Sequence, residues 1–259
     1  MPLLPDDKNN AVRPLKWYRN LATTKGRLEA GAFLVEGDRA IGQIINNNPD
    51  AVMEIISTEK LPSFYRKYPL RVVTESQLSS ICASRTPQGT AAVVRMPLDI
   101  YSDRIPDNTG DNILLLEDVQ DPRNVGSLIR TAVAFDYSGI ILTQECADPL
   151  SPKSIQPSMG TVLSLWLRRT PRYLELVKEL KDRGYSLVVT ELNAVEGPSV
   201  LRSQDKLLLA LGNEGTGLSR SLLDISDHRV GIPIEQEKIE SLNVAACGAI
   251  CMYLSYHKH

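Results

Sequence analysis

Short apolar runs alternate with amphipathic segments along most of this 259-residue chain. From residue 112 onward, the apolar runs that predict strands occupy residues 113–116, 139–142, 186–189, 207–211 and 229–232. Helical spacing is found at about residues 124–135 and 173–183, and a last helix is expected to start at Ser241. Strands that alternate with helices indicate an α/β fold with a mostly parallel sheet covered on both faces.

The first 96 residues show the same alternation on a smaller scale. Apolar runs lie at residues 32–35, 51–56, 71–73 and 90–94, with amphipathic segments at 39–45 and 76–82. Residues 97–111 are polar and contain Pro97, Pro106 and Gly110, which is typical of a segment between domains. We therefore predict a small α/β domain at 1–96, a linker at 97–111 that permits relative motion, and a larger domain at 112–259.

Composition narrows the class of protein. Apolar residues make up 42% of the chain and the net charge is −2, as in a globular protein. No apolar run approaches the roughly 20 residues that span a bilayer, and the first residues lack the pattern of a secretion signal, so we expect a cytoplasmic protein. The four cysteines and three histidines have no paired ligand spacing, and no metal site or disulfide framework is expected.

Basic residues gather near the N-terminus, and the first 96 residues carry a net positive charge while the remainder is negative. The basic residues that interleave with Trp17 and Tyr18 are Lys8, Arg13, Lys16, Arg19, Lys25 and Arg27. Such a mixture suits phosphate contact and base stacking. The solvated face of an amphipathic helix explains the same pattern, and we favour that interpretation for these residues taken alone.

Polar residues follow the predicted strand at 113–116 and continue into the next helix. The chain turns through Asp121-Pro122 and enters a helix on which Asn124, Ser127 and Arg130 lie one or two turns apart. These three side chains share a face and are candidates for a site. Simple capping by Asp121 and Asn124, with Arg130 as a surface charge, explains the residues equally well.

A glycine-rich turn, Gly212-Asn213-Glu214-Gly215-Thr216-Gly217, follows the predicted strand at 207–211. Open α/β sheets bind ligands where strands end, so the turn is a candidate binding loop. Its spacing is not the dinucleotide pattern G-x-G-x-x-G, and no P-loop lysine follows, which argues against NAD binding and ATP hydrolysis. A tight turn that merely requires glycine is the alternative explanation.

A third group begins at Ile232-Pro233-Ile234 and ends at Ser241-Leu242-Asn243-Val244. We expect Ser241 to cap the last helix, whose first N–H groups could then bind a ligand. Small residues at 245–249 indicate close packing of this helix, but close packing does not account for Ser241 and Asn243.

Together these three groups resemble the sequence motifs of the SpoU/TrmH family of RNA 2′-O-ribose methyltransferases, within the SPOUT class. The match extends over residues 114–253. Phe33-Leu34-Val35-Glu36-Gly37 and Thr86-Pro87-Gln88-Gly89 also resemble the small ribosomal-protein-like substrate-binding domain of many members. The resemblance implies a C-terminal trefoil-knotted methyltransferase domain, an exception to the rule that chains do not thread loops. It also implies a homodimer and S-adenosylmethionine as cofactor.

The resemblance assigns roles to individual positions of this chain. The cofactor-binding residues it implies are Leu211, Gly212, Glu214, Ile232, Leu242, Asn243 and, with weaker support, Thr190. The catalytic set it implies is Asn124, Arg130, Glu214, Ser241 and Asn243. An arginine side chain stays charged at neutral pH, so we expect Arg130 to grip an RNA phosphate and stabilise the developing alkoxide. Glu214 or water is left to take the proton.

Two departures from the family pattern stand out. Residues 235–238 contain no glycine and make the loop after Ile232-Pro233-Ile234 about one residue longer, and Ala245 stands where serine is common. The leading hypothesis is methylation of a ribose 2′-hydroxyl in structured RNA, with ribosomal RNA preferred to transfer RNA because an extra domain precedes the catalytic one. A non-catalytic RNA-binding or ribosome-assembly protein that kept the fold is the alternative. The modified nucleotide cannot be determined from the sequence.

Overall fold

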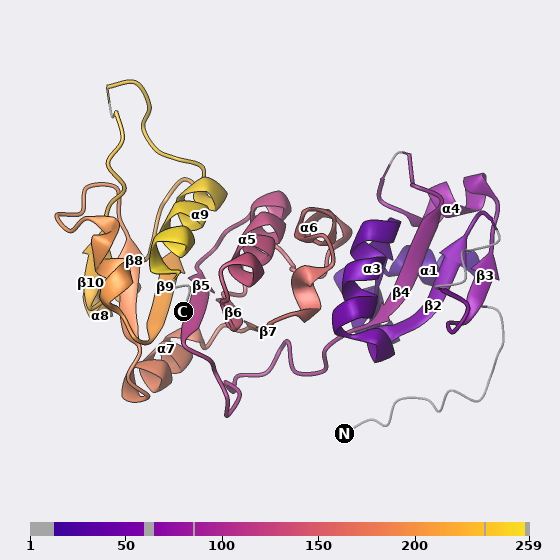
Figure 1. Ribbon diagram of the computed structural model, residues 1–259, viewed down its shortest axis with the longest axis horizontal. Coiled ribbons are helices and arrows are strands. Elements are labelled where there is room, and N and C mark those ends of the chain that lie inside the picture. The colour runs from indigo at the N-terminus through magenta and orange to yellow at the C-terminus, as the bar shows by residue number, and fades with distance from the viewer. Residues whose placement is uncertain (1–12, 60–64, 85, 236, 257–259) are drawn as a thin grey trace.

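Two β-sheets organise the chain in the computed structural model, which describes residues 13–59, 65–84, 86–235 and 237–256 (Figure 1). The first sheet has four strands in the order β1-β4-β2-β3. Their bounds are β1 Ala32–Glu36, β2 Val52–Ser57, β3 Leu70–Val72 and β4 Thr90–Arg95. The second sheet has six strands in the order β10-β8-β9-β5-β6-β7.

Every strand pair of the second sheet is parallel. Its strands are β5 Asn112–Leu116, β6 Gly139–Leu142, β7 Trp166–Arg169, β8 Ser186–Thr190, β9 Leu207–Leu211 and β10 His228–Val230. Helices α5 Pro122–Ala134, α6 Pro152–Ser158 and α9 Val244–Ser255 belong to the layer on one face. Helices α7 Tyr173–Asp182 and α8 Arg220–Ile225 cover the other face. The predicted α/β class with a mostly parallel sheet is confirmed.

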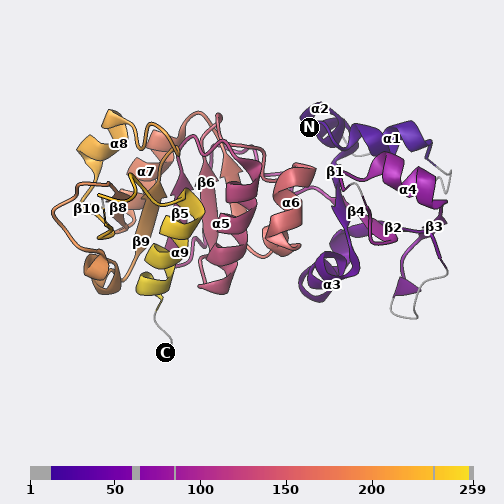
Figure 2. The same ribbon diagram turned by 90° about the horizontal axis from the view of Figure 1, so that it is seen from above.

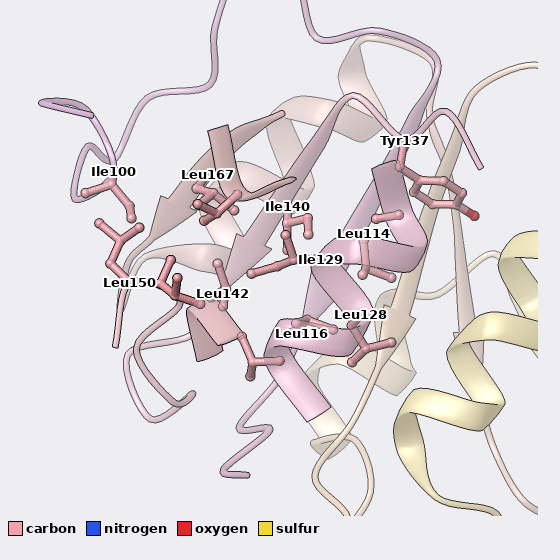
Figure 3. Close-up of a cluster of buried hydrophobic side chains, with 14 of the residues drawn as sticks. Ile100, Leu114, Leu116, Leu128, Ile129, Tyr137, Ile140, Leu142, Leu150 and Leu167 are labelled. Atoms are coloured by element: carbon pink, nitrogen blue, oxygen red, sulfur yellow. The ribbon is translucent and has the colours of Figure 1, made fainter. Parts of the chain in front are cut away.

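Strand β5 is apolar from Ile113 to Leu116 because it is buried on both faces of the sheet. Leu114 and Leu116 point toward Leu128 of α5, as Figure 3 shows, while Ile113 and Leu115 belong to the cluster beneath α7. Successive side chains of a strand point to opposite faces, so a central parallel strand is buried on both. β5 ends at Leu116, and the polar residues that follow it, beginning with Glu117, lie at the carboxyl edge of the sheet.

Helices also cover both faces of the first sheet. On one side lie α1 Leu15–Asn20, α2 Thr24–Ala30 and α4 Glu75–Ile81, and on the other lies α3 Asp38–Asn47. Short 3-10 turns occur at Pro49–Ala51, Thr161–Leu163 and Pro198–Ser203.

Tyr18 is fully buried and its hydroxyl donates to Glu54 at 2.8 Å, while Trp17 packs edge-on against it. The aromatic residues of this region therefore serve the core of the first sheet, and Tyr18 is not available to stack on a base. Lys8 lies outside the described residues.

The sequence did not predict α6, α8 or β7. A serine cap and a proline at the first turn start α6, because the Ser151 hydroxyl accepts from the Ser154 N–H. Strand β7 carries two arginines, which hid its strand character. Among the described residues no helix is long and apolar enough to cross a membrane.

Residues 97–111, which we predicted to be a linker between the domains, contact the second sheet. Ile100 and Ile105 are buried. Arg168 of β7 forms an ion pair with Asp99 at 2.7 Å, and the backbone N–H of Arg169 donates to the carbonyl of Ile100 at 2.7 Å. The segment is therefore fastened along the edge strand of the second sheet.

Replacing Gly126 by alanine should destabilise the fold. A Cβ at this position of α5 would lie 2.1 Å from the carbonyl oxygen of Ser154 in α6, which is backbone and cannot rotate away. Overpacking of this kind costs about 1–3 kcal/mol of unfolding free energy, measurable by urea denaturation. The matched control is Gly42→Ala in α3, where a Cβ meets nothing within 4 Å. We expect it to be neutral or to stabilise by up to about 1 kcal/mol; equal destabilisation by both changes would contradict the packing described for α5 and α6.

Candidate active site

The carboxyl ends of β5, β8 and β9 lie at one edge of the parallel sheet, and a pocket of about 610 Å³ opens there. This is the edge at which open α/β sheets bind ligands. The residues that line the pocket come from the loops after β8, β9 and β10 and from the start of α9. They are Thr190–Asn193, Gly212–Leu218, Leu223, Val230, Ile232, Ile234, Glu240–Leu242, Val244 and Cys247.

The glycine-rich loop is closed by its own backbone. The N–H groups of Asn213 and Gly217 donate to each other's carbonyls at 3.1 and 3.0 Å. A Cβ on Gly212 would lie 2.4 Å from the carbonyl carbon of Gly217, so only glycine fits there. The Asn213 side chain donates to the carbonyl of Asp118 at 2.8 Å and joins this loop to the turn after β5. From the sequence we assigned no role to Asn213, whose contacts become visible only in three dimensions.

A chain of hydrogen bonds joins three of the predicted catalytic residues. The Asn124 amide donates to the Glu214 carboxylate at 2.8 Å, and the Asn243 amide donates to the side-chain oxygen of Asn124 at 3.1 Å. Glu214 also accepts long hydrogen bonds from the backbone N–H groups of Gln120 and Asp121. Asn124 is thus oriented from both sides, by the glycine-rich loop and by the start of α9.

The last helix begins three residues later than the sequence suggested. It starts at Val244, and Asn243, not Ser241, is its N-cap. The Asn243 side-chain oxygen accepts from the N–H groups of Ala245 and Ala246 at 2.9 and 3.3 Å. An asparagine in this position satisfies the first N–H groups as well as a serine would. Ser241 is left exposed in the extended segment that lines the pocket.

Glu117 joins the end of the glycine-rich loop to α7 by hydrogen bonds. Its carboxylate is buried and accepts from the Ser219 N–H at 2.6 Å, the Ser219 hydroxyl at 2.7 Å and the Tyr173 hydroxyl at 2.5 Å. Burial, together with the hydrogen bond to Glu117, raises the pKa of Tyr173 to about 12, so the phenol stays protonated. These bonds fix the residue that ends the glycine-rich loop. Glu117 directly follows an apolar strand, which was its signal in the sequence, but we assigned it no role from the sequence.

Most residues of the predicted cofactor set line the pocket. Gly212, Glu214, Ile232, Leu242 and Thr190 do so. Leu211 is buried in β9, where its side chain packs under α9 near Gly248. Asn243 is turned toward Asn124 and is not among the lining residues.

The pocket also contains polar residues outside the predicted catalytic and cofactor-binding sets. Two carboxylates, Glu191 and Glu240, lie on its wall together with Asn193. Cys247 lies there as well, and a hydrogen bond from Cys251 lowers the pKa of Cys247. Cys247 is partly exposed at the pocket wall, whereas Cys251 is fully buried.

Arg130 lies apart from the pocket of its own chain. It is exposed on α5 and does not line the pocket. No hydrogen bond or ion pair of its guanidinium occurs among the described residues. Arg123 in the first turn of the same helix is different, because it pairs with Asp121 at 2.8 Å and holds the pKa of that carboxyl below its usual value. The structure thus brings Asn124, Glu214 and Asn243 together and leaves Arg130 facing outward. The described part of the chain contains no cluster of three or more residues able to hold a metal ion.

Comparisons with known proteins identify the family of the chain. Residues 111–253 match the model of the SpoU rRNA methylase family, and residues 10–92 match that of the MRM3-like substrate-binding domain. The chain is 29% identical over 258 residues to a 23S rRNA (guanosine(2553)-2′-O)-methyltransferase, RlmP, of Bacillus subtilis, with 98% of each chain covered. It is 30% identical to an uncharacterized tRNA/rRNA methyltransferase of Synechocystis sp., over 92% of this chain and 89% of the relative.

Solved structures show the same two-part architecture. The crystal structure of the SpoU methyltransferase AviRb from Streptomyces viridochromogenes, in complex with AdoMet, superposes with a TM-score of 0.81 at 27% identity and covers 95% of this chain and 97% of that one. The AdoMet-bound rRNA methyltransferase of Sinorhizobium meliloti gives 0.78 at 25% identity, with 93% of each chain covered. The family predicted from the sequence is confirmed: the chain belongs to the SpoU rRNA methylase family of RNA methyltransferases.

Proposed function

We propose that this chain transfers a methyl group from S-adenosylmethionine to a ribose 2′-hydroxyl of ribosomal RNA. The observation that carries the proposal is the hydrogen-bonded chain Glu214–Asn124–Asn243, which joins the glycine-rich loop, α5 and the start of α9 beside a pocket at the carboxyl edge of a parallel sheet. The relative from Bacillus subtilis, similar over nearly the whole chain, is named for this reaction on 23S rRNA. Transfer RNA is the second candidate, because the name of the Synechocystis relative includes it.

The pocket fits the proposed methyl donor in size and chemistry. Its volume of about 610 Å³ lies within the roughly 300–1,000 Å³ of small-molecule sites. Apolar side chains such as Ile232 and Leu242 can cover the adenosine, and the carboxylates Glu191 and Glu240 can meet a cationic amino group. When bound, S-adenosylmethionine supplies a methyl group on a positively charged sulfur. Thr190, Leu211, Gly212, Glu214, Ile232, Leu242 and Asn243 remain the proposed cofactor-binding set.

The proposed roles of the catalytic residues follow from their contacts. Asn124 and Asn243 are held by each other and by Glu214, so they can position the ribose relative to the donor. Both oxygens of Glu214 accept protein N–H groups, and we therefore assign it an orienting role and leave the proton to water. Ser241, exposed on the pocket wall, is placed to contact the RNA. Arg130 is proposed to bind a phosphate and to stabilise the developing alkoxide.

The position of Arg130 favours a homodimer. Arg130 is exposed on α5, and α9, which packs against α5, carries or precedes the exposed side chains Ile250, Tyr253 and Tyr256. Phe135, just after α5, contacts Tyr253 edge-on and Tyr256 at a tilted angle, so these three aromatic side chains form one patch. A second copy on this patch would bring its own pocket toward Arg130. We propose residues 1–96 as the RNA-binding domain and 112–259 as a knotted catalytic domain, acting in the cytoplasm.

Methyl transfer to RNA tests the proposed function. The purified protein is incubated with S-adenosylmethionine carrying a labelled methyl group and with ribosomal or transfer RNA from cells that lack the gene. Label in ribosomal RNA supports the proposal, and label in transfer RNA alone would replace the substrate. Absence of label in both, with the donor bound, would favour the alternative of a non-catalytic RNA-binding or assembly protein.

A further inference from the structure

The two sheets are joined by an ion pair that is withdrawn from solvent. Arg27 of α2, 2% exposed, meets Asp148 of the loop after β6 at 2.5 Å. The guanidinium also donates to the Leu21 carbonyl and the Thr24 hydroxyl, and that hydroxyl donates to Asp148 at 3.1 Å. The cation thus comes from the first domain and the anion from the second. Breaking a buried pair leaves an uncompensated charge, so this contact strongly favours one relative placement of the domains.

Apolar packing surrounds the ion pair. Phe33 and Val35 of β1 belong to the same buried cluster as Leu150, Ile155 and Val162 of the catalytic domain. Helix α6 lies between α5 and the elements of the first sheet in both views (Figures 1 and 2). Core continuity of this kind resembles a permanent interface and differs from the polar contact of domains that move freely.

Backbone contacts add to this interface. A Cβ on Gly160, after α6, would lie 2.3 Å from the carbonyl oxygen of Ala40 in α3. The Asn48 amide donates to the Leu163 carbonyl at 2.9 Å, and that of Asn47 to the Ser164 hydroxyl at 3.0 Å. The AviRb structure superposes over both parts of the chain, so the relative placement is shared with a crystal structure.

The loop that carries Asp148 also contacts the catalytic loops. The N–H of Ala147 donates to the Val119 carbonyl at 2.9 Å. Thr143 accepts from the N–H of Asp118, a residue held at a positive φ of 56°, and donates to its carboxylate. The Asp118 carbonyl in turn accepts from Asn213 of the glycine-rich loop. Hydrogen bonds between residues next to Asp148 and residues of the turn after β5 therefore connect the domain interface to the glycine-rich loop.

We propose that Arg27 and Asp148 are positioning residues for RNA methylation. Their buried pair fixes the first domain against the catalytic loops, so that RNA held by the first domain reaches the methyl donor in one geometry. The inference rests on the proposed function for its effect on RNA. It departs from the expectation that residues 97–111 let the domains move, because that segment is itself fastened to β7.

The test compares three variants of the full chain. Asp148→Asn removes the anion with little change of shape. Gly160→Ala forces a Cβ to 2.3 Å from the Ala40 carbonyl oxygen at a different domain contact, and it also strains the backbone, because Gly160 has a φ of +79°. Glu29→Gln is the matched control, because it breaks the exposed Lys25–Glu29 pair on the same helix as Arg27. A misplacement of about 1 Å lowers rates about 100-fold. We expect kcat/KM for ribosomal RNA to fall about 100-fold in the first two variants, with the dissociation constant for S-adenosylmethionine within about twofold of wild type. Small-angle X-ray scattering should show a larger radius of gyration.

A value of kcat/KM within twofold of wild type in Asp148→Asn would overturn the proposal, as would an unchanged radius of gyration. Parallel loss of cofactor affinity would indicate a merely structural role and would overturn it too. If Asp148→Asn does not fold, the kcat/KM and the radius of gyration of Gly160→Ala decide the proposal. If neither variant folds, the interface is needed for folding and the proposal is overturned. If the wild-type protein methylates no RNA, the proposed function fails, while scattering and cofactor titration still decide whether the pair fixes the domains.

Discussion

Replacing Gly212 by alanine is expected to weaken binding of S-adenosylmethionine about 10- to 100-fold. The new Cβ would lie 2.4 Å from the Gly217 carbonyl carbon and 2.6 Å from the Leu218 nitrogen. Both atoms are backbone, so the loop that forms one wall of the pocket must open. Overpacking costs about 1–3 kcal/mol, and each 1.4 kcal/mol lost from binding is about tenfold in affinity. Calorimetric titration of the purified variant measures the change.

The matched control is Gly197→Ala, in the loop after β8. A Cβ there meets nothing within 4 Å, and Gly197 has the extended conformation that any residue adopts. We expect its affinity for the donor to equal that of the wild type. If Gly212→Ala bound the donor as tightly as Gly197→Ala, the glycine-rich loop would not be a wall of the cofactor site.

Replacing Arg130 by alanine is expected to lower kcat for RNA methylation about 100- to 1,000-fold, the usual loss when a donor to a developing oxyanion is removed. Affinity for S-adenosylmethionine should stay within about twofold, because Arg130 does not line the pocket. The side chain is exposed and makes no hydrogen bond or ion pair within the described ranges, so its removal should leave the fold intact. Single-turnover methylation and calorimetry separate these two effects.

Arg130→Lys and Arg220→Ala complete the experiment. Lysine keeps the charge but loses the two-pronged geometry of the guanidinium, and we expect an intermediate rate. Arg220 is an exposed arginine on α8 that pairs with Asp224, and its loss should leave the rate unchanged. Weaker donor binding by Arg130→Ala, with a normal rate once the donor is bound, would contradict the role assigned to Arg130.

Strands of the second sheet were the most predictable part of the fold. β6 and β9 begin and end where the apolar runs predict, because central parallel strands are buried on both faces and read as continuous apolar sequence. β7 escaped prediction because it is an edge strand whose Arg168 and Arg169 bond to the segment before β5. Those partners are more than sixty residues away in the sequence, and no local pattern reports them.

The sequence allowed us to predict which residues belong to the candidate site, but not which of them bond to each other. Spacing and family resemblance named Asn124, Glu214 and Asn243 but could not show that the three side chains bond in series. We predicted Ser241 as the N-cap of α9, and the structure has Asn243 in that position. Serine and asparagine both cap helices, so the sequence does not distinguish them. The interface around Arg27 and Asp148 was invisible for another reason: each residue reads as an ordinary surface charge until the partner from the other domain is present.

The chemical position of the transferred methyl group tests the account most directly. RNA methylated by the purified protein is digested with alkali, which needs a free 2′-hydroxyl to cut the chain, and the products are analysed by mass spectrometry. The account predicts that the label stays in an alkali-resistant dinucleotide with the methyl group on ribose. Label released on single nucleotides, with the methyl group on a base, would contradict ribose methylation by this site.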